Sequence, residues 1–206
     1  MEMELKEFTI EKTIIGPITI VFQDSDNVLI KNIILSTPDL KSKEIAYENY
    51  DNLDSVSFSH LNKRIKKLVL DIQDYLNGKD FKFSLDNFDF SGCSPFEREV
   101  LNAEYNTKRG SVNTYGELAK EIGHPKAYRA VGNALRKNPF PIVIPCHRTI
   151  KKDRTIGGFN GYQGGIESKE ILLSLENVEV QQRKVISESP VISLNKKAQK
   201  KLDIDN

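Results

Sequence analysis

The sequence predicts a two-domain α+β protein, with a sheet-rich first half and a helical second half. Short β-branched and aromatic runs separated by turn residues dominate the first third of the chain, whereas helix-capping patterns recur in the second half. Acidic residues outnumber basic ones up to about residue 90, and basic residues predominate beyond it. A chain of 206 residues is long enough for two domains that each bury a core. We expect a first domain at 1–88, a second at 92–180 and a disordered basic tail at 181–206.

A small antiparallel sheet and one helix are expected in the first domain. β-branched and aromatic residues favour strands, and the polar residues 24–27 supply turn chemistry between two of them. The expected strands lie at 13–15, 18–22, 28–35 and 81–85. Apolar residues recur at helical spacing over 61–76, and Gly78 is placed to end that helix.

The second domain opens with clear helix-capping signals. Ser94 matches a capping serine, Pro95 a proline at the first helical position, and Glu97 the acidic residue three positions after the cap. This pattern predicts a helix over 95–106. Residues 114–117 repeat the capping box, which predicts a second, shorter helix.

A helix-turn-helix is expected next. Gly123 ends the shorter helix, and a further helix begins at Pro125 and runs to about residue 137. On a helical wheel this last helix buries an apolar stripe and turns a basic face outward. The stripe consists of Val131, Ala134 and Leu135, and the outward face of Lys126, Arg129, Asn133, Arg136 and Lys137. Such a face is typical of a solvated helix, and only its helix-turn-helix context favours phosphate contacts.

A cysteine beside a histidine follows a proline-rich segment. Three prolines at 139–145 predict an extended backbone that presents Cys146. The ordinary thiol pKa is about 8.5, so Cys146 needs a neighbouring base or cation to react as a thiolate. His147 would need a kink or a bridging water to act as that base, because adjacent side chains on an extended strand point apart. Two cysteines are too few for a disulfide framework, and we assign Cys93 a buried structural role.

Five segments together resemble the O6-alkylguanine-DNA alkyltransferases. They lie in order between residues 94 and 176 and are Arg129-Ala130-Val131-Gly132, Asn138-Pro139, Pro145-Cys146-His147-Arg148, Gly161-Tyr162-Gln163-Gly164-Gly165 and Lys169-Glu170. No single segment is specific, but their joint occurrence is. The resemblance implies a ribonuclease-H-like N-terminal domain, a C-terminal domain with a winged helix-turn-helix, and direct-reversal DNA repair. In that activity one protein molecule irreversibly takes one alkyl group from O6 of guanine, or O4 of thymine.

The resemblance also implies roles for five residues of the reaction centre. Cys146 resembles the acceptor of the alkyl group, and His147 the base that acts on it through a water. Glu176 occupies the position of the carboxylate that orients the histidine. Asn138 resembles a hinge residue that braces the site, and Tyr115 the tyrosine that donates a proton to guanine N3.

Base flipping follows from the same resemblance, because a buried thiol cannot reach a base inside a duplex. Arg129 resembles the arginine that enters the stack from the minor groove and fills the space of the extruded base. The other expected DNA contacts are Thr114, Tyr115, Gly116, His124, Ala127, Ala130 and Arg136. The expected substrate pocket consists of Pro141, Val143, Tyr162 and Gln163. Gln163 stands where a small residue is frequent in the family, which predicts a narrower pocket.

Neither a cofactor nor a metal is expected, and the zinc ligands of some relatives are absent from the sequence. The expected partner is double-stranded DNA containing O6-alkylguanine, bound through the minor groove by a monomer without membrane association. The acidic opening segment does not resemble a secretory signal, so a cytoplasmic location is expected, or a nuclear one in a eukaryote. Three alternatives stay open: a non-catalytic binder of alkylated DNA, a helix-turn-helix regulator that senses alkylation or redox state, and a cysteine hydrolase.

Overall fold

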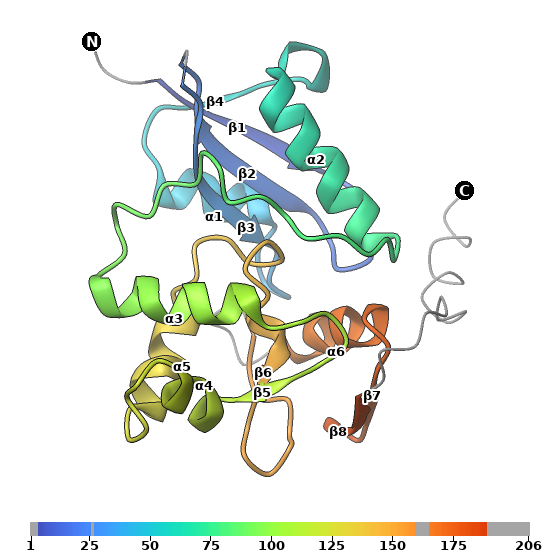
Figure 1. The fold of residues 1–206 in the computed structure, drawn as a ribbon. Helices are drawn as coiled ribbons and strands as arrows, with labels where there is room; N and C mark the ends of the chain where they lie inside the picture. The colour runs from blue at the N-terminus through green and yellow to red at the C-terminus, as the bar shows by residue number, and fades with distance from the viewer. Residues whose placement is uncertain (1–3, 26, 160–164, 189–206) are drawn as a thin grey trace. The chain divides into compact units, whose positions relative to one another are not determined.

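The computed structural model describes residues 4–25, 27–159 and 165–188. Two compact units make up the fold (Figure 1). One is drawn from Met1–Gly92 and Pro139–Val143, and the other from Cys93–Asn138 and Ile144–Asn206. Both contain helices and strands, so the chain has a mixed α and β fold. No helix within the described ranges is long and apolar enough to cross a bilayer.

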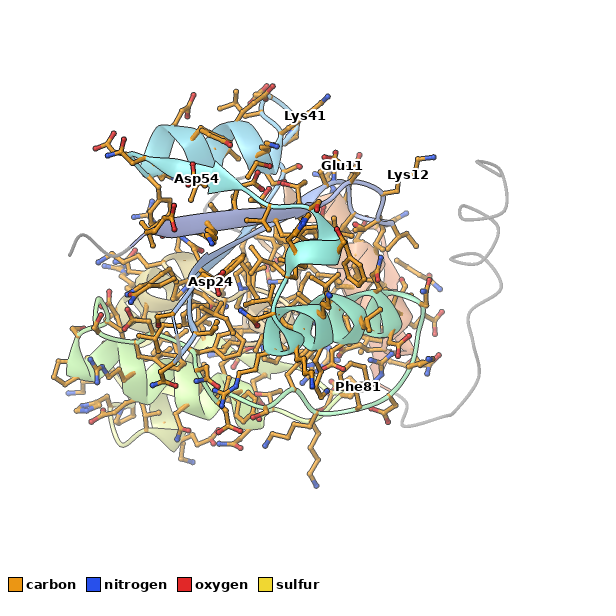
Figure 2. The ribbon with its side chains drawn as sticks, turned by 90° about the horizontal axis from the view of Figure 1, so that it is seen from above. Glu11, Lys12, Asp24, Lys41, Asp54 and Phe81 are labelled. Atoms are coloured by element: carbon orange, nitrogen blue, oxygen red, sulfur yellow. The ribbon has the colours of Figure 1, made fainter. Side chains whose placement is uncertain are left out.

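The first unit is a four-stranded sheet with a helix on each face. Its strands are β1 (Leu5–Ile10), β2 (Ile18–Gln23), β3 (Leu29–Leu35) and β4 (Leu53–Ser55), in the order β3-β2-β1-β4. Neighbouring strands are antiparallel except for β1 and β4, which are parallel. The helices α1 (Ser42–Asn49) and α2 (Lys63–Leu76) lie on opposite faces of the sheet (Figures 1 and 2). Every residue of β2 is therefore buried.

Expectations for the first unit are confirmed in part. The helix expected over 61–76 is α2, which begins after an Asn62 side chain that accepts two backbone N–H bonds and ends before Gly78. The strand expected at 13–15 is wrong, because those residues turn into Gly16, whose φ of 89° closes the turn. The strand expected at 81–85 is also wrong: this segment is irregular, although Phe83 packs in the core.

The second unit contains four α-helices among its described residues. They are α3 (Pro95–Asn106), α4 (Tyr115–Glu121), α5 (Tyr128–Arg136) and α6 (Ile166–Leu175). Both expected capping boxes are present, at the starts of α3 and α4. The helix α5 begins three residues later than expected, because Ala127 N–H bonds to the carbonyl of His124 in a turn. Its apolar stripe is buried as expected.

Two pairs of short strands complete the second unit. The strands β5 (Asn113–Thr114) and β6 (Thr149–Ile150) pair in parallel, and β7 (Val178–Gln181) and β8 (Lys184–Glu188) form an antiparallel hairpin. Residues 181–188, expected as the start of a disordered tail, are thus ordered. Gln182 and Arg183 have φ values of 50° and 60°, as a two-residue hairpin turn requires, and Val185 is buried in the core. Residues 189–206 lie outside the described part of the chain.

A five-residue segment inside the second half of the sequence belongs to the first unit. Residues 139–143 belong to the first unit, whereas the residues on either side belong to the second. Phe140 is fully buried, with its ring centroid 4.9 Å from that of Phe88 and 5.1 Å from that of Phe90, in edge-to-face geometry. The segment that leads to Cys146 is therefore anchored by aromatic packing in the first unit.

Candidate active site around Cys146

The backbone turns sharply before Cys146 instead of running extended. Pro145 has φ and ψ of −81° and 57°, and Cys146 N–H donates to the carbonyl of Ile144 at 2.8 Å, which is an inverse γ-turn. Residues Cys146–Arg148 then form one turn of 3₁₀-helix. Proline restricts its own φ but leaves ψ open, so the three prolines do not enforce an extended chain. This kink removes the opposite-face constraint that an extended strand would place on His147.

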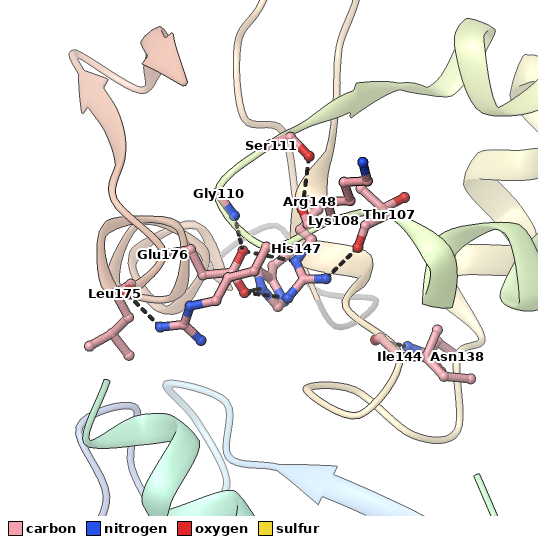
Figure 3. Close-up of polar contacts among 11 residues, drawn as sticks. Thr107, Lys108, Gly110, Ser111, Asn138, Ile144, His147, Arg148, Leu175 and Glu176 are labelled. Carbon is pink, nitrogen blue, oxygen red and sulfur yellow. Dashed lines mark hydrogen bonds and ion pairs between the residues drawn. The ribbon is translucent and has the colours of Figure 1, made fainter. Parts of the chain in front are cut away.

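The thiol of Cys146 is held in a buried position by Asn138. Cys146 is 7% exposed, and the Asn138 amide hydrogen-bonds its sulfur. The same amide group donates to the carbonyl of Ile144 at 2.9 Å, which fixes its orientation (Figure 3). Burial raises the pKa of the Cys146 thiol to about 11, although the bond from Asn138 favours the thiolate. The resting thiol is therefore protonated at neutral pH, and its reaction requires a proton acceptor.

A buried carboxylate joins the histidine and the arginine that follow Cys146. Glu176 lies 3.0 Å from Nε2 of His147 and accepts two bonds from Arg148, at 2.7 and 2.8 Å (Figure 3). Burial alone would raise the pKa of Glu176, but its hydrogen bonds with His147 and Arg148 and the positive charge of Arg148 hold that pKa well below the ordinary value. Burial lowers the pKa of His147 despite the neighbouring carboxylate. His147 is thus a neutral imidazole at neutral pH, able to accept a proton.

The backbone around Glu176 is tied to the loop after α3. Arg148 Nη1 donates to the carbonyl of Thr107 at 2.6 Å, and Gly110 N–H approaches Glu176 at 3.4 Å. Arg109 donates to the carbonyl of Leu175 at 2.7 Å (Figure 3). The end of α6 is therefore fixed against this loop, which positions the carboxylate.

We expect Glu176→Gln to destabilise the protein by about 3–5 kcal/mol at neutral pH, because it removes one partner of a buried ion pair. Urea unfolding monitored by circular dichroism measures the change. The matched control is Glu179→Gln, an exposed carboxylate on β7, which we expect to leave the unfolding midpoint almost unchanged. Equal midpoints for the wild type and the Glu176 variant would contradict the assigned ion pair.

The same pair predicts how stability depends on pH. The pKa of Glu176 is lower in the folded protein than in the unfolded chain, so its stabilisation is present above the ordinary carboxyl pKa of about 4.3. This stabilisation is lost as the pH falls from the ordinary carboxyl pKa through the lower pKa that Glu176 has in the folded protein. The difference in unfolding free energy between the wild type and Glu176→Gln should therefore shrink in acid, as urea titrations at several pH values would show.

A second buried group of polar residues lies beside Cys146 and was not anticipated. The Thr149 cluster consists of Glu104 on α3, Thr149 on β6 and Lys169 on α6, each at most 1% exposed. Only the position of Glu104, three residues after Leu101 on the apolar face of α3, signals its burial in the sequence. Among the described residues, no three His, Cys, Asp or Glu side chains gather as metal ligands.

A cavity of about 1080 Å³ opens beside Tyr115 at the start of α4. Three expected DNA contacts, Thr114, Tyr115 and Gly116, line it together with the basic residues Lys120, Lys151, Lys152 and Arg154. Burial raises the pKa of the Tyr115 phenol to about 12, and charge interactions with Cys146 and Glu104 act in the same direction. Tyr115 therefore remains a proton donor at neutral pH. Glu117 and Glu188 also line the cavity, and Glu188 pairs with Arg154 at 2.7 Å, so four cations and two carboxylates leave its lining positive overall and favourable to anions.

The remaining expected site residues fall into three groups. Pro141 and Val143 are buried and belong to the first unit, whereas Tyr162 and Gln163 lie outside the described residues. The expected DNA contacts on and before α5 are wholly or partly accessible. They are His124, Ala127, Arg129, Ala130 and Arg136.

The start of α5 presents an arginine beside an exposed aromatic ring. The guanidinium of Arg129 lies 5.7 Å from the ring centroid of Tyr128, which is 49% exposed. At the other end of the helix, Lys137 pairs with Glu97 at 3.0 Å. The two ends of the basic face therefore differ in their contacts, with an aromatic ring beside Arg129 and a carboxylate beside Lys137.

Comparisons with known proteins agree on one family. The family model described as "6-O-methylguanine DNA methyltransferase, DNA binding domain" matches residues 95–178. The methylated-DNA–protein-cysteine methyltransferase of Methanothermobacter thermautotrophicus is 43% identical over 117 residues, covering 57% of this chain and 64% of that protein. The Thermococcus kodakarensis protein of the same name is 43% identical over 131 residues, covering 58% of this chain and 71% of the relative.

Solved structures with the same fold extend the comparison over most of the chain. The crystal structure of Mycobacterium tuberculosis O6-methylguanine methyltransferase has a TM-score of 0.63 and 28% identity, covering 86% of this chain and 96% of that one. The structure of OGT from the same organism in complex with DNA has a TM-score of 0.61 and 26% identity, covering 83% and 92% of the two chains. By its sequence and its fold, the chain belongs to the methylated-DNA–protein-cysteine methyltransferase family.

Proposed function

We propose that this protein repairs DNA directly by taking the alkyl group from O6 of guanine, or O4 of thymine, onto Cys146. The observation that carries the proposal is a buried thiol held by Asn138 and followed by His147, whose ring bonds the buried Glu176. The family's printed name, with a protein cysteine as the methyl acceptor, supports the same chemistry.

The reaction is a single displacement at the alkyl carbon. The Cys146 thiol gives its proton to His147, through a water in the proposed geometry, and the sulfur forms a bond to carbon as the bond from carbon to O6 breaks. The electron pair goes to the guanine, and Tyr115 donates a proton to N3 of that base. The Tyr115 proton is then replaced from His147, so the products are guanine and an S-alkyl cysteine. Because the thioether is inert, each molecule reacts once.

DNA recognition is assigned to the helices α4 and α5 as part of a winged helix-turn-helix. Gly123, with a φ of 79°, turns the chain between them, and the N-terminal end of α5 presents Arg129. We place this arginine in the minor groove, where it replaces the flipped base and where Ala127 and Ala130 permit close approach. The DNA complex of the M. tuberculosis relative supports a DNA partner.

The first unit is assigned a ribonuclease-H-like fold. Three antiparallel strands followed by a fourth that runs parallel to β1 support this assignment.

We also propose that the protein acts as a monomer at genomic DNA, in the cytoplasm or, in a eukaryote, in the nucleus. We place Tyr162 and Gln163 in the alkyl pocket with Pro141 and Val143, on the family resemblance alone.

Intact-mass spectrometry after mixing with duplex DNA containing O6-methylguanine tests the function. The expected result is the mass of one added methyl group per protein molecule, on the peptide that contains Cys146, with no further repair when DNA is in excess. Repair beyond one methyl per molecule would indicate a hydrolase and overturn the proposal. Tight binding of methylated DNA without any mass increase would indicate a non-catalytic binder.

A further inference from the structure

The Thr149 cluster carries an inference about how Cys146 is controlled. Thr149 lies three residues after Cys146 and is fully buried. Its hydroxyl donates to Oε2 of Glu104, and its carbonyl accepts a bond from Nζ of Lys169 at 2.6 Å. One residue of the cysteine segment therefore joins a buried acid from α3 to a buried base from α6.

The carboxyl group of Glu104 makes fewer hydrogen bonds than a buried carboxyl group usually does. Its Oε1 has no hydrogen-bond partner among the described residues, and the whole side chain is excluded from solvent. Burial raises the pKa of the Glu104 carboxyl to about 7, although Thr149, Lys169 and Arg148 favour the ionised form. Glu104 therefore changes its charge close to neutral pH.

Lys169 affects the Cys146 thiol in the direction opposite to Glu104. Burial lowers the pKa of its ammonium group to about 8, and the charge interaction with Glu104 opposes that shift. The positive charge of Lys169 favours the Cys146 thiolate, whereas the negative charge of Glu104 disfavours it. Two ionisable groups of opposite effect thus act on one thiol from within the same cluster.

We propose that Glu104 and Lys169, joined through Thr149, form a buried charge pair that sets how readily Cys146 loses its proton. Lys169 promotes the thiolate and Glu104 restrains it. Both are positioning residues, which act on the reaction through Cys146. The inference rests on the proposed function, in which Cys146 is the acceptor, and it adds a control of that acceptor by pH.

The pH dependence follows from the charge of Glu104. At pH values below the pKa of Glu104 this side chain is neutral, and only the charge of Lys169 acts on Cys146. The pKa of the Cys146 thiol is then lower than when Glu104 is charged. As Glu104 ionises, its charge opposes the thiolate, so within the Glu104 titration the reactivity rises with pH less steeply than one power of ten per unit. The other charged or titratable groups that face this pair are Arg148, Glu121, Tyr115, Lys151 and His147.

Alkylation by iodoacetamide measures thiolate reactivity without DNA. A Cys93→Ser background leaves Cys146 as the single thiol of the full chain. In that background we compare Glu104→Gln with the parent between about pH 5.5 and about pH 7.5, a range that spans the Glu104 titration. The two rate constants should coincide at the acid end, and the variant should react about three- to tenfold faster at the upper end, since one nearby charge shifts a pKa by about one unit.

A substitution of Lys169 tests whether a positive charge has the opposite effect on the reactivity of Cys146. Lys169→Met should slow the same reaction about threefold or more at neutral pH, because it removes the cation that favours the thiolate. The matched control is Glu99→Gln, which removes an exposed carboxylate from the same helix as Glu104 and should leave the profile unchanged. If Glu104→Gln fails to fold, Thr149→Val replaces it, since loss of the hydroxyl donor keeps Glu104 protonated to higher pH.

Parallel pH profiles for the parent and Glu104→Gln would overturn the inference, since a packing effect changes the rate equally at every pH. Faster alkylation of Lys169→Met would overturn it as well. Failure of the proposed function is a separate outcome, because it concerns methyl transfer from DNA. If the iodoacetamide profiles of the parent and Glu104→Gln diverge but no methyl group is transferred from DNA, the charge pair is upheld and the proposed function is rejected. If methyl transfer occurs but the two profiles are parallel, the function is upheld and the charge pair is rejected.

Discussion

The Cys146→Ala protein should transfer no alkyl group, with a loss of at least about 10⁴-fold, because the substitution removes the sulfur that accepts the group. The His147 and Glu176 pair would persist but would have no thiol to deprotonate. Transfer of labelled methyl from duplex DNA to protein measures the loss. DNA binding, followed in parallel by gel shift, should remain close to that of the wild type because the expected DNA contacts lie elsewhere.

Cys93 provides the matched control for this result. It is the other of the two cysteines in the sequence, is partly buried, and lies just before α3. Cys93→Ala should therefore accept label as the wild type does. Label on the Cys146 variant, or loss of label on the Cys93 variant, would show that the acceptor has been assigned to the wrong thiol.

The Arg129→Ala protein should repair duplex DNA about 100-fold more slowly, yet react almost normally with the free base O6-benzylguanine. Extruding a base from a duplex costs a few kcal/mol, and a side chain that fills the gap offsets part of this cost. The free base has no stack to leave. Single-turnover rates with both substrates measure the separation.

A general loss of charge must be distinguished from the loss of a side chain that fills the stack. Lys137→Ala removes one positive charge from the other end of α5, where the lysine pairs with Glu97. It should affect the two substrates to a similar, small extent. Equal slowing of both substrates by Arg129→Ala would indicate a structural role for the arginine instead.

Local signals explain which elements the sequence predicted well. The capping boxes at Ser94 and Thr114 specify helix starts through contacts within four residues, and both starts are confirmed. Strand pairing is not local, and the buried positions of β1, Glu7 and Ile10, do not alternate, so the sequence did not predict this strand. The hairpin β7-β8 was missed because its turn uses Gln182 and Arg183 instead of the usual Asn-Gly.

Motifs and packing contribute differently to the candidate site. Cys146, His147 and Glu176 were found through their family pattern, and the structure brings the histidine and the carboxylate to 3.0 Å. Nothing in the sequence pairs Glu104 with Lys169, because the packing of α3, β6 and α6 decides their burial. A buried acid on an apolar helix face is a signal that helical periodicity alone could have supplied.

The aromatic anchor at Phe140 limits how this gene could be divided or recombined. A fragment that begins at Cys93 would carry residues 139–143 away from Phe88 and Phe90 and would expose a ring whose burial contributes about 1.5–3 kcal/mol. The complementary fragment would lose part of its core. A chain made only of residues 95–178, the stretch that the family model matches, would therefore contain Phe140 without the two rings that pack against it. Exchange of one half between relatives, in evolution or in the laboratory, would have to preserve the fit of these five residues to the half they came from.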